Sequence, residues 1–118
     1  MAEVPQWTIL EYTAGSGACP VREFLEGLTG RNREEALALL GRLRQAGAAL
    51  RRPTSGALGE GLFELRGREV RLFYMFLPGR RAVLLDGMVK KQAAIPPSVL
   101  QRIRRYQREV ASLAEGRH

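Results

Sequence analysis

Three short apolar runs in the second half of the chain constrain its fold most strongly. GLFELR (61–66), VRLFYMFL (70–77) and RAVLLDGMV (81–89) contain the apolar and aromatic residues typical of strands, and short turn segments separate them. Pro78 and Gly79, a pair suited to a type II turn, join the second run to the third. Because connections this short join neighbouring antiparallel strands, we expect a three-stranded antiparallel meander.

Apolar residues recur at helical spacing on both sides of these strands. In residues 20–28 they fall at i, i+3, i+4 and i+7 behind a proline that suits a first helical turn, and residues 97–113 carry a longer apolar stripe. The last segment also places Arg102, Arg105 and Arg108 on another face. It therefore predicts a helix that packs on the sheet and presents arginine to solvent or to a partner.

A further helix is predicted over residues 32–47. Asn32 followed by Glu35 resembles a capping box, and Gly47 provides a stop after a face of leucines.

The remaining segments complete the order strand, helix, helix, three strands, helix. Residues 7–12 (WTILEY) predict a first strand, and residues 51–59, which contain proline, serine and glycine, predict a loop. Because helices and strands are segregated along the chain, we expect a single α+β domain over residues 1–118. In this domain an antiparallel meander sheet packs with two N-terminal helices and one C-terminal helix.

Composition limits the location and the chemistry. No apolar run approaches the roughly 20 residues that span a bilayer, and residues 1–10 lack the basic and apolar regions of a signal peptide. We therefore expect a cytoplasmic protein with no membrane partner.

Cys19 is the only cysteine and His118 the only histidine, so the chain has neither an internal disulfide nor a Cys/His zinc site. We expect no metal and no small-molecule cofactor.

The chain is strongly basic, with a formal net charge of +7. An excess of this size favours a polyanionic partner, usually nucleic acid, or an acidic protein that neutralises it. Of the basic residues 17 are arginine and two are lysine. A GC-rich genome would also produce this bias, so charge alone leaves both interpretations open.

Charged residues interrupt the otherwise apolar strands. Glu64 and Arg66 alternate with apolar neighbours and so project from one face, while Arg71 opens the next strand. One interpretation is an ion pair between Glu64 and one of these arginines; the other is that the arginines reach a partner or substrate.

The two lysines of the chain are adjacent, at Lys90 and Lys91. Lysine, unlike arginine, can donate or accept a proton, although a solvated loop is the alternative.

Asp86, the only aspartate, lies in the last predicted strand and either pairs with an arginine or orients a catalytic group. The remaining polar residues form a set suited to gripping phosphates and stabilising the transition state of RNA self-cleavage, in which the 2′-hydroxyl attacks its own phosphate. This set is Arg66, Arg68, Arg71, Tyr74, Arg80, Lys90 and Lys91.

The strings LGEGLFELR and VRLFYMFLPGRRAVLLDGMVKKQAAIPPSVL resemble the phage-derived HigB-like branch of the RelE/ParE toxin superfamily. WTILEY and PVREFLEGL also match, so the resemblance extends from about Trp7 to Tyr106. It implies a small RelE-like domain and a type II toxin–antitoxin toxin. Such a toxin is a metal-independent endoribonuclease (an mRNA interferase) that cleaves mRNA on the ribosome, and a helix-turn-helix antitoxin neutralises it.

The resemblance also implies roles for individual residues. It places the catalytic positions at Arg66, Arg71, Lys90 and Lys91. We assign RNA binding to Arg68, Tyr74, Arg80, Arg81 and Asp86. Many relatives resemble LLHGFVKK where this chain has LLDGMVKK, with histidine in place of Asp86. This departure leaves open a toxin that uses another acid or base, or one that has lost RNase activity.

Two other function classes remain open. A ParE-like inhibitor of DNA gyrase would share the superfamily without being an enzyme. A non-catalytic basic nucleic-acid-binding module would need the charge alone. The lysine pair and the strand arginines favour cleavage, because a gyrase inhibitor has no evident need for a catalytic face.

Overall fold

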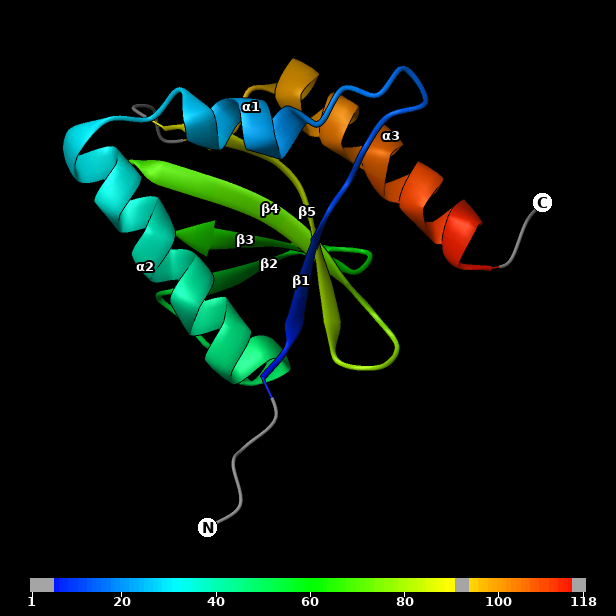
Figure 1. Ribbon diagram of the computed structural model, residues 1–118, viewed down its shortest axis with the longest axis horizontal. Helices are drawn as coiled ribbons and strands as arrows, with labels where there is room; N and C mark the ends of the chain where they lie inside the picture. The colour runs from blue at the N-terminus through cyan, green and yellow to red at the C-terminus, as the bar shows by residue number, and fades with distance from the viewer. Residues whose placement is uncertain (1–5, 91–93, 116–118) are drawn as a thin grey trace, which may run out of the picture.

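The computed structural model describes residues 6–90 and 94–115 (Figure 1). In chain order the helices and strands are β1 (Thr8–Glu11), α1 (Pro20–Glu26), α2 (Gly30–Ala46), the 3-10 helix η1 (Gly47–Ala49), β2 (Ser55–Gly59), β3 (Leu62–Arg66), β4 (Val70–Leu77), β5 (Arg81–Val89) and α3 (Pro97–Ala114). β4 and β5 have the bounds predicted from their apolar runs. None of the described helices is long and apolar enough to cross a bilayer.

The strands form one mixed sheet in the order β1-β5-β4-β3-β2. β2, β3, β4 and β5 pair as antiparallel neighbours, which confirms the predicted meander. β1, however, pairs in parallel with β5, so the prediction of a purely antiparallel sheet is wrong. The reason lies in the connection: the chain passes through α1 and α2 after β1, and a long crossover permits the parallel pairing that a tight hairpin excludes.

The segment predicted as a loop over residues 51–59 contains the edge strand β2. Ser55 pairs with Leu65 and Gly56 with Glu64, and the register shifts between Ala57 and Gly59. A sequence of small residues and glycine has little intrinsic preference for a strand. Pairing with the neighbouring β3 therefore decides its conformation.

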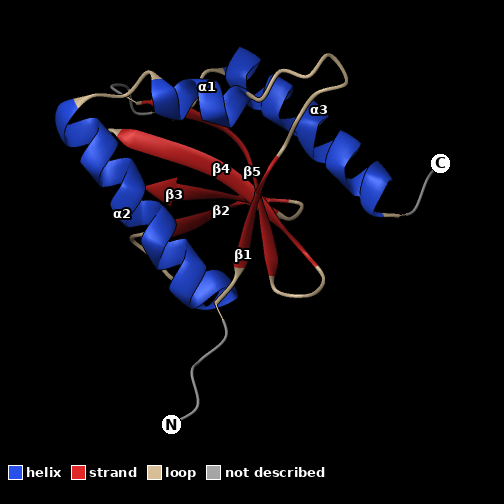
Figure 2. Cartoon of the chain, viewed as in Figure 1, coloured by secondary structure: helices blue, strands red, loops and turns tan. Residues whose placement is uncertain are grey.

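Helices cover both faces of the sheet (Figure 2). One core joins α1 and α2 to the sheet and includes Val21, Leu43 and Leu72. The other joins α3 to the opposite face and includes Phe73 and Ile103. Adjacent residues of β4 thus enter different cores, as strand alternation requires.

The start of α2 corrects a sequence-based expectation. The helix begins after Thr29, whose backbone is extended, and Asn32 lies within the first turn. The Glu35 side chain accepts hydrogen bonds from the backbone of the turn between β3 and β4. The predicted capping box is therefore wrong, because a tertiary contact uses the carboxylate that the local motif needed.

Candidate functional site

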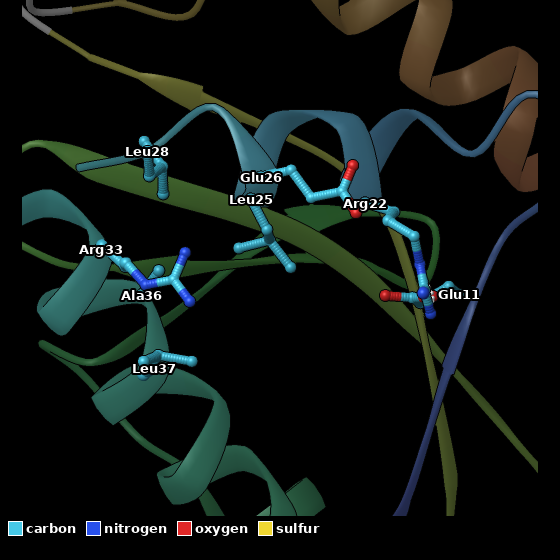
Figure 3. Close-up of a pocket in the computed structure, with 8 residues that line it drawn as sticks. All are labelled: Glu11, Arg22, Leu25, Glu26, Leu28, Arg33, Ala36 and Leu37. Carbon is cyan, nitrogen blue, oxygen red and sulfur yellow. Dashed lines mark hydrogen bonds and ion pairs between the residues drawn. The ribbon is translucent and has the colours of Figure 1, made fainter.

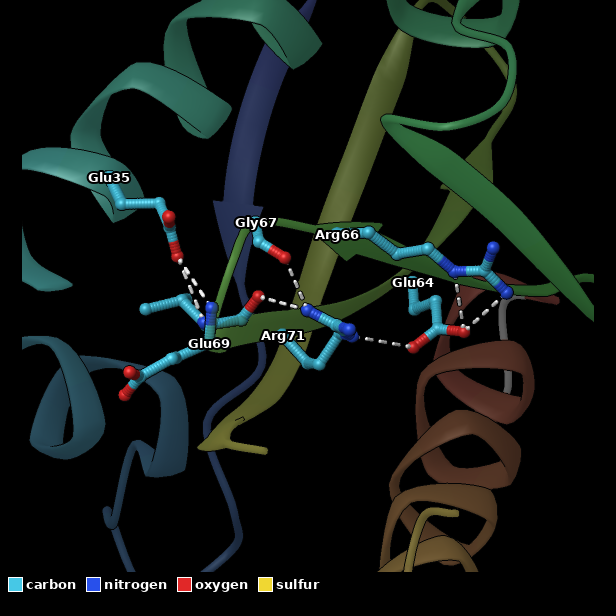
Figure 4. Close-up of polar contacts among 7 residues, drawn as sticks. Glu35, Glu64, Arg66, Gly67, Glu69 and Arg71 are labelled. Atoms are coloured by element: carbon cyan, nitrogen blue, oxygen red, sulfur yellow. Dashed lines mark hydrogen bonds and ion pairs between the residues drawn. The ribbon is translucent and has the colours of Figure 1, made fainter. Parts of the chain in front are cut away.

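Three charged side chains share the α3 face of the sheet near the turn that joins β3 to β4 (Figure 4). Glu64 and Arg66 lie on the same face of β3 as Leu62, which packs in the core beneath α3. The cross-strand register places Arg66 directly opposite Arg71. Like charges at opposed positions destabilise a sheet, so this pair needs a neutralising group.

The Glu64 carboxylate supplies that group. Its Oε2 accepts a hydrogen bond of 3.1 Å from Nε of Arg66 and lies 3.1 Å from Nη2. Its Oε1 lies 3.6 Å from Nε of Arg71. The Glu64 side chain is 3% exposed, against 15% for Arg71 and 36% for Arg66. The ion pair considered from the sequence is therefore present, and it involves both arginines.

The guanidinium of Arg71 is held from two further directions. Nη1 donates to the backbone carbonyls of Gly67, at 2.6 Å, and Val70, at 3.1 Å. Oε1 of Glu64 and Nε of Arg71 are buried and make no hydrogen bond within the described residues. These contacts fix the guanidinium of Arg71 at the start of β4.

Gly56 allows Arg66 to lie flat across β2. An added Cβ at this position would lie 2.8 Å from Cζ and Nη2 of Arg66, a distance that real Cβ atoms essentially never show. Gly56 is also the cross-strand partner of Glu64. A side chain here would thus displace the guanidinium from its place beside Glu64.

Glu35 anchors the turn between β3 and β4 from the other side of the sheet. Oε2 accepts from the backbone N–H of Arg68 at 2.8 Å, and Oε1 accepts from Glu69 at 3.2 Å and Val70 at 2.9 Å. Burial alone would raise the pKa of Glu35, but these three N–H groups and the Arg68 charge lower it below its ordinary value of 4.5. The ionised carboxylate therefore stabilises the turn that carries Arg66 and Arg71 at its ends.

Glu35→Gln is expected to lower the free energy of unfolding by about 1–2 kcal/mol at neutral pH, since hydrogen bonds to a charged acceptor are lost. The pKa of Glu35 is lower in the folded state. Its contribution is thus complete above the unfolded pKa and disappears as pH falls through the folded pKa. Urea unfolding of both proteins from neutral pH to about pH 3 measures this difference. Glu34→Gln, at an exposed position of α2, is the control. A difference that does not shrink in acid would contradict the assigned charge.

Two other predicted site residues lie at the same end of the sheet. The backbone N–H of Lys90 donates to the Glu69 carbonyl at 2.6 Å, which extends the β4–β5 ladder one residue past β5. Lys90 is half-buried, and Arg68 is exposed in the turn. Lys91 lies outside the described residues. Arg66, Arg68, Arg71 and Lys90 are named the turn cluster from here on.

Asp86 and Tyr74, two of the residues assigned to RNA binding, lie outside the turn cluster. Oδ2 of Asp86 is 3.1 Å from both Nε and Nη2 of Arg102, which joins β5 to α3. Tyr74 is 1% exposed, and its hydroxyl lies 2.6 Å from that of Ser55; burial raises the pKa of Tyr74. Of the two alternatives considered for Asp86, pairing with an arginine is the one observed. Tyr74 belongs to the core of the opposite face of the sheet.

Arg80 and Arg81 lie at the far end of the sheet. Arg80 places its guanidinium 5.1 Å from the ring centroid of Trp7, and Nε of Arg81 donates to the Pro78 carbonyl at 2.7 Å. Six strand residues at about 3.3 Å each separate this end from Arg71, roughly 20 Å. The set predicted from the sequence is therefore split between two ends of the sheet.

Three residues that shape the turn cluster or its surroundings were not predicted as part of the site. Glu35 binds the backbone of the β3–β4 turn, Gly56 leaves space for the Arg66 side chain, and Arg102 forms an ion pair with Asp86. Each acts on residues at least ten positions away in sequence. Only the pairing of the strands and the packing of the helices reveal these contacts.

A cavity of about 220 Å³ lies between α1 and α2 (Figure 3). Leu25, Leu28 and Leu37 provide much of its lining, and the ion pair of Arg22 with Glu11, at 2.5 Å, lies at its edge. It contains no member of the turn cluster. The cavity is therefore separate from the charged site.

These features define a small α+β protein whose sheet carries fixed arginine side chains at one end, an arrangement suited to an anionic ligand. The family model described as phage derived protein Gp49-like (DUF891) matches residues 23–108. The chain therefore belongs to the Gp49-like family. No curated protein matches it.

Proposed function

We propose that this chain is the toxin of a type II toxin–antitoxin pair and acts as a ribosome-dependent mRNA endoribonuclease. The observation that carries the proposal is the pair of guanidinium groups, Arg66 and Arg71, held around a buried carboxylate in a protein of the Gp49-like family. That family is associated with RelE-like toxins. The basic charge of the chain also supports an RNA substrate.

In the proposed reaction the substrate supplies the nucleophile. The 2′-oxygen forms a bond to the adjacent phosphorus while the bond to the 5′-oxygen breaks. Negative charge builds on the phosphoryl oxygens, and guanidinium groups that are already oriented stabilise it without reorganisation. Arg71 is suited to this role because Glu64, Gly67 and Val70 fix its position. Arg66, which is more exposed, would contact the same phosphate or its neighbour.

Two protons must move in this reaction, one from the 2′-hydroxyl and one to the 5′-oxygen. We assign these transfers to the Lys90 and Lys91 pair, as lysine exchanges a proton far more readily than arginine does. Glu64 is excluded as the base, because its Oε1 is buried and its Oε2 binds Arg66. It is a positioning residue.

Changing Lys90 and Lys91 together to arginine is expected to lower the cleavage rate about 100-fold while leaving RNA affinity within a few-fold. Charge is kept, whereas the accessible proton is lost. Single-turnover cleavage and binding to uncleavable RNA with a 2′-deoxy substitution measure the two effects. Cleavage at the original rate would show that the lysines only bind phosphate.

Gly56→Ala is expected to reduce cleavage about ten-fold with little change in the melting temperature. The new methyl group meets the far end of the Arg66 side chain, which can move, so the catalytic geometry changes more than the core does. Gly15→Ala is a matched control, because nothing lies within 4 Å of a Cβ there. Unchanged cleavage by Gly56→Ala would remove Arg66 from the proposed catalytic group.

The proposed partners are the ribosome with its mRNA and a helix-turn-helix antitoxin made alongside the toxin. Arg68, which is exposed, and Arg66, which is partly exposed, attract carboxylates, so an acidic antitoxin segment would cover the turn cluster and block RNA. The proposal places the protein in the cytoplasm, where these partners occur.

The test is induced expression in a bacterial host, followed by mapping of mRNA ends and by cleavage with purified protein and translating ribosomes. We expect growth arrest, loss of translation and new ends within coding sequence. Growth arrest with intact mRNA and inhibited supercoiling would instead identify a ParE-like gyrase inhibitor. Normal growth with the folded protein present would overturn the toxin proposal.

A further inference from the structure

The outward face of α3 forms a second basic surface, apart from the turn cluster. Gln101, Arg105, Arg108 and Ser112 recur at helical spacing and are all exposed, while Ile103 on the opposite side is completely buried. Arg105 lies with its guanidinium 5.5 Å from the Tyr106 ring centroid.

The other two arginines of α3 flank this face and attach the helix to the sheet. Nη2 and Nη1 of Arg104 donate to the Leu58 and Gly59 carbonyls, each at 2.9 Å. Arg102 pairs with Asp86. These contacts hold the helix in one place, so the exposed arginines between them occupy fixed positions along its surface.

Among the described residues of α3 and its C-terminal cap, four arginines stand against two acidic residues, Glu109 and Glu115. The only acidic residue of α3 is Glu109, whose Oε2 accepts a hydrogen bond of 2.8 Å from the Tyr12 hydroxyl at the sheet. A shallow depression of about 800 Å³ runs over the helix. All four arginines of α3 line it, and none of the described residues in its lining is acidic.

We propose that this surface, formed by Gln101, Arg105, Arg108 and the flanking Arg102 and Arg104, binds the phosphate backbone of RNA without reading its sequence. The inference rests on the proposed function for the identity of the polyanion. It adds a docking site that sets affinity and leaves the chemical step to the turn cluster.

The composition of the surface favours RNA over an acidic protein. Protein interfaces have an apolar centre from which charge is depleted, whereas phosphate contacts need arginine and polar side chains on an open surface. The centre of this face is polar and charged, and Ile103 and Val110 point away from it into the core. α3 lies on the same face of the sheet as Arg66 and Arg71. One RNA strand can therefore contact both sites without passing around the molecule.

The experiment measures binding of the full chain to a labelled single-stranded RNA and, separately, to ribosomes, from about 50 to about 200 mM salt. The variant Arg105→Ala/Arg108→Ala is compared with Arg31→Ala/Arg33→Ala, which removes the same charge from exposed positions of α2 on the other face. Both variants carry Arg71→Ala to prevent cleavage, and their melting curves establish that they are folded.

We expect the α3 variant to bind RNA of any sequence about ten-fold more weakly, with the dependence of log K on log salt reduced by about 1.4, or about 0.7 for each lost phosphate contact. The α2 variant should change affinity less than about three-fold. Weakened binding in the ribosome arm alone would identify ribosomal RNA as the backbone bound, and weakened binding in both arms would include mRNA.

Equal effects of the two variants, or an unchanged salt dependence, would overturn the inference. Binding to poly-glutamate is the remaining comparison. If the α3 variant kept its RNA binding but lost binding to poly-glutamate, the inference would also be overturned, because the surface would then serve an acidic protein. If the wild-type protein did not cleave mRNA but bound RNA through α3, the result would contradict the proposed endoribonuclease and still support the docking surface.

Discussion

Arg71→Ala is expected to lower the rate of mRNA cleavage by about 100-fold or more, the largest effect on activity of any single change in the turn cluster. Its guanidinium is the most constrained cation of the cluster, with contacts to Glu64, Gly67 and Val70. A donor fixed before the reaction stabilises the transition state at little reorganisation cost. The loss should therefore fall on kcat, measured with ribosome-bound mRNA at saturation, more than on KM.

Two further variants sharpen the Arg71 test. Arg71→Lys keeps the charge but loses the planar fork, and it should recover only a small part of the activity. Arg31→Ala removes an exposed arginine from α2 on the opposite face and should leave cleavage unchanged. Arg71→Ala protein that melts cooperatively and still cleaves at the wild-type rate would show that the proposed site is elsewhere.

Glu64→Ala is expected to lower the free energy of unfolding by about 3–5 kcal/mol, the range for removing one partner of a buried ion pair. The Glu64 side chain is 3% exposed and lies between two opposed arginines. Without it, Arg66 and Arg71 repel each other, and the Arg71 charge remains largely buried without a counterion. The melting temperature should fall by on the order of 10 °C, which calorimetry or circular dichroism measures.

A second pair of variants separates charge from packing at Glu64. Glu64→Gln keeps the shape and one acceptor for Arg66 but removes the charge, so it should lie between the wild type and Glu64→Ala. Glu34→Ala, at an exposed site on α2, should change stability by less than about 0.5 kcal/mol. Equal stability of Glu64→Ala and the wild type would mean that the two arginines do not need this carboxylate.

Local patterns predicted most of the secondary structure because the relevant physics acts over a few residues. The apolar runs of β4 and β5 end at turn residues, and Gly79, with φ of 85°, adopts the left-handed conformation that its place after Pro78 predicts. The edge strand β2 was missed because its small residues become a strand only through pairing with β3.

The candidate site was only partly predictable for a related reason. Alternation along β3 places Glu64 and Arg66 on one face, and this can be read from five residues. The opposition of Arg66 and Arg71 depends on the register of β3 against β4. The burial of Tyr74 depends on which face of the sheet α2 covers, and no local pattern contains that information.

The sequence by itself determined that the chain is a basic α+β domain with a meander and three amphipathic helices, because periodicity, turn residues and net charge are local or additive properties. The tertiary structure decided which charges act together. It joined Arg66 and Arg71 through Glu64, moved Glu35 from a local cap to the β3–β4 turn, and placed Arg80 and Arg81 at the other end. Electrostatic interactions depend on distance and burial, and for residues far apart in the chain both are set only when the sheet assembles.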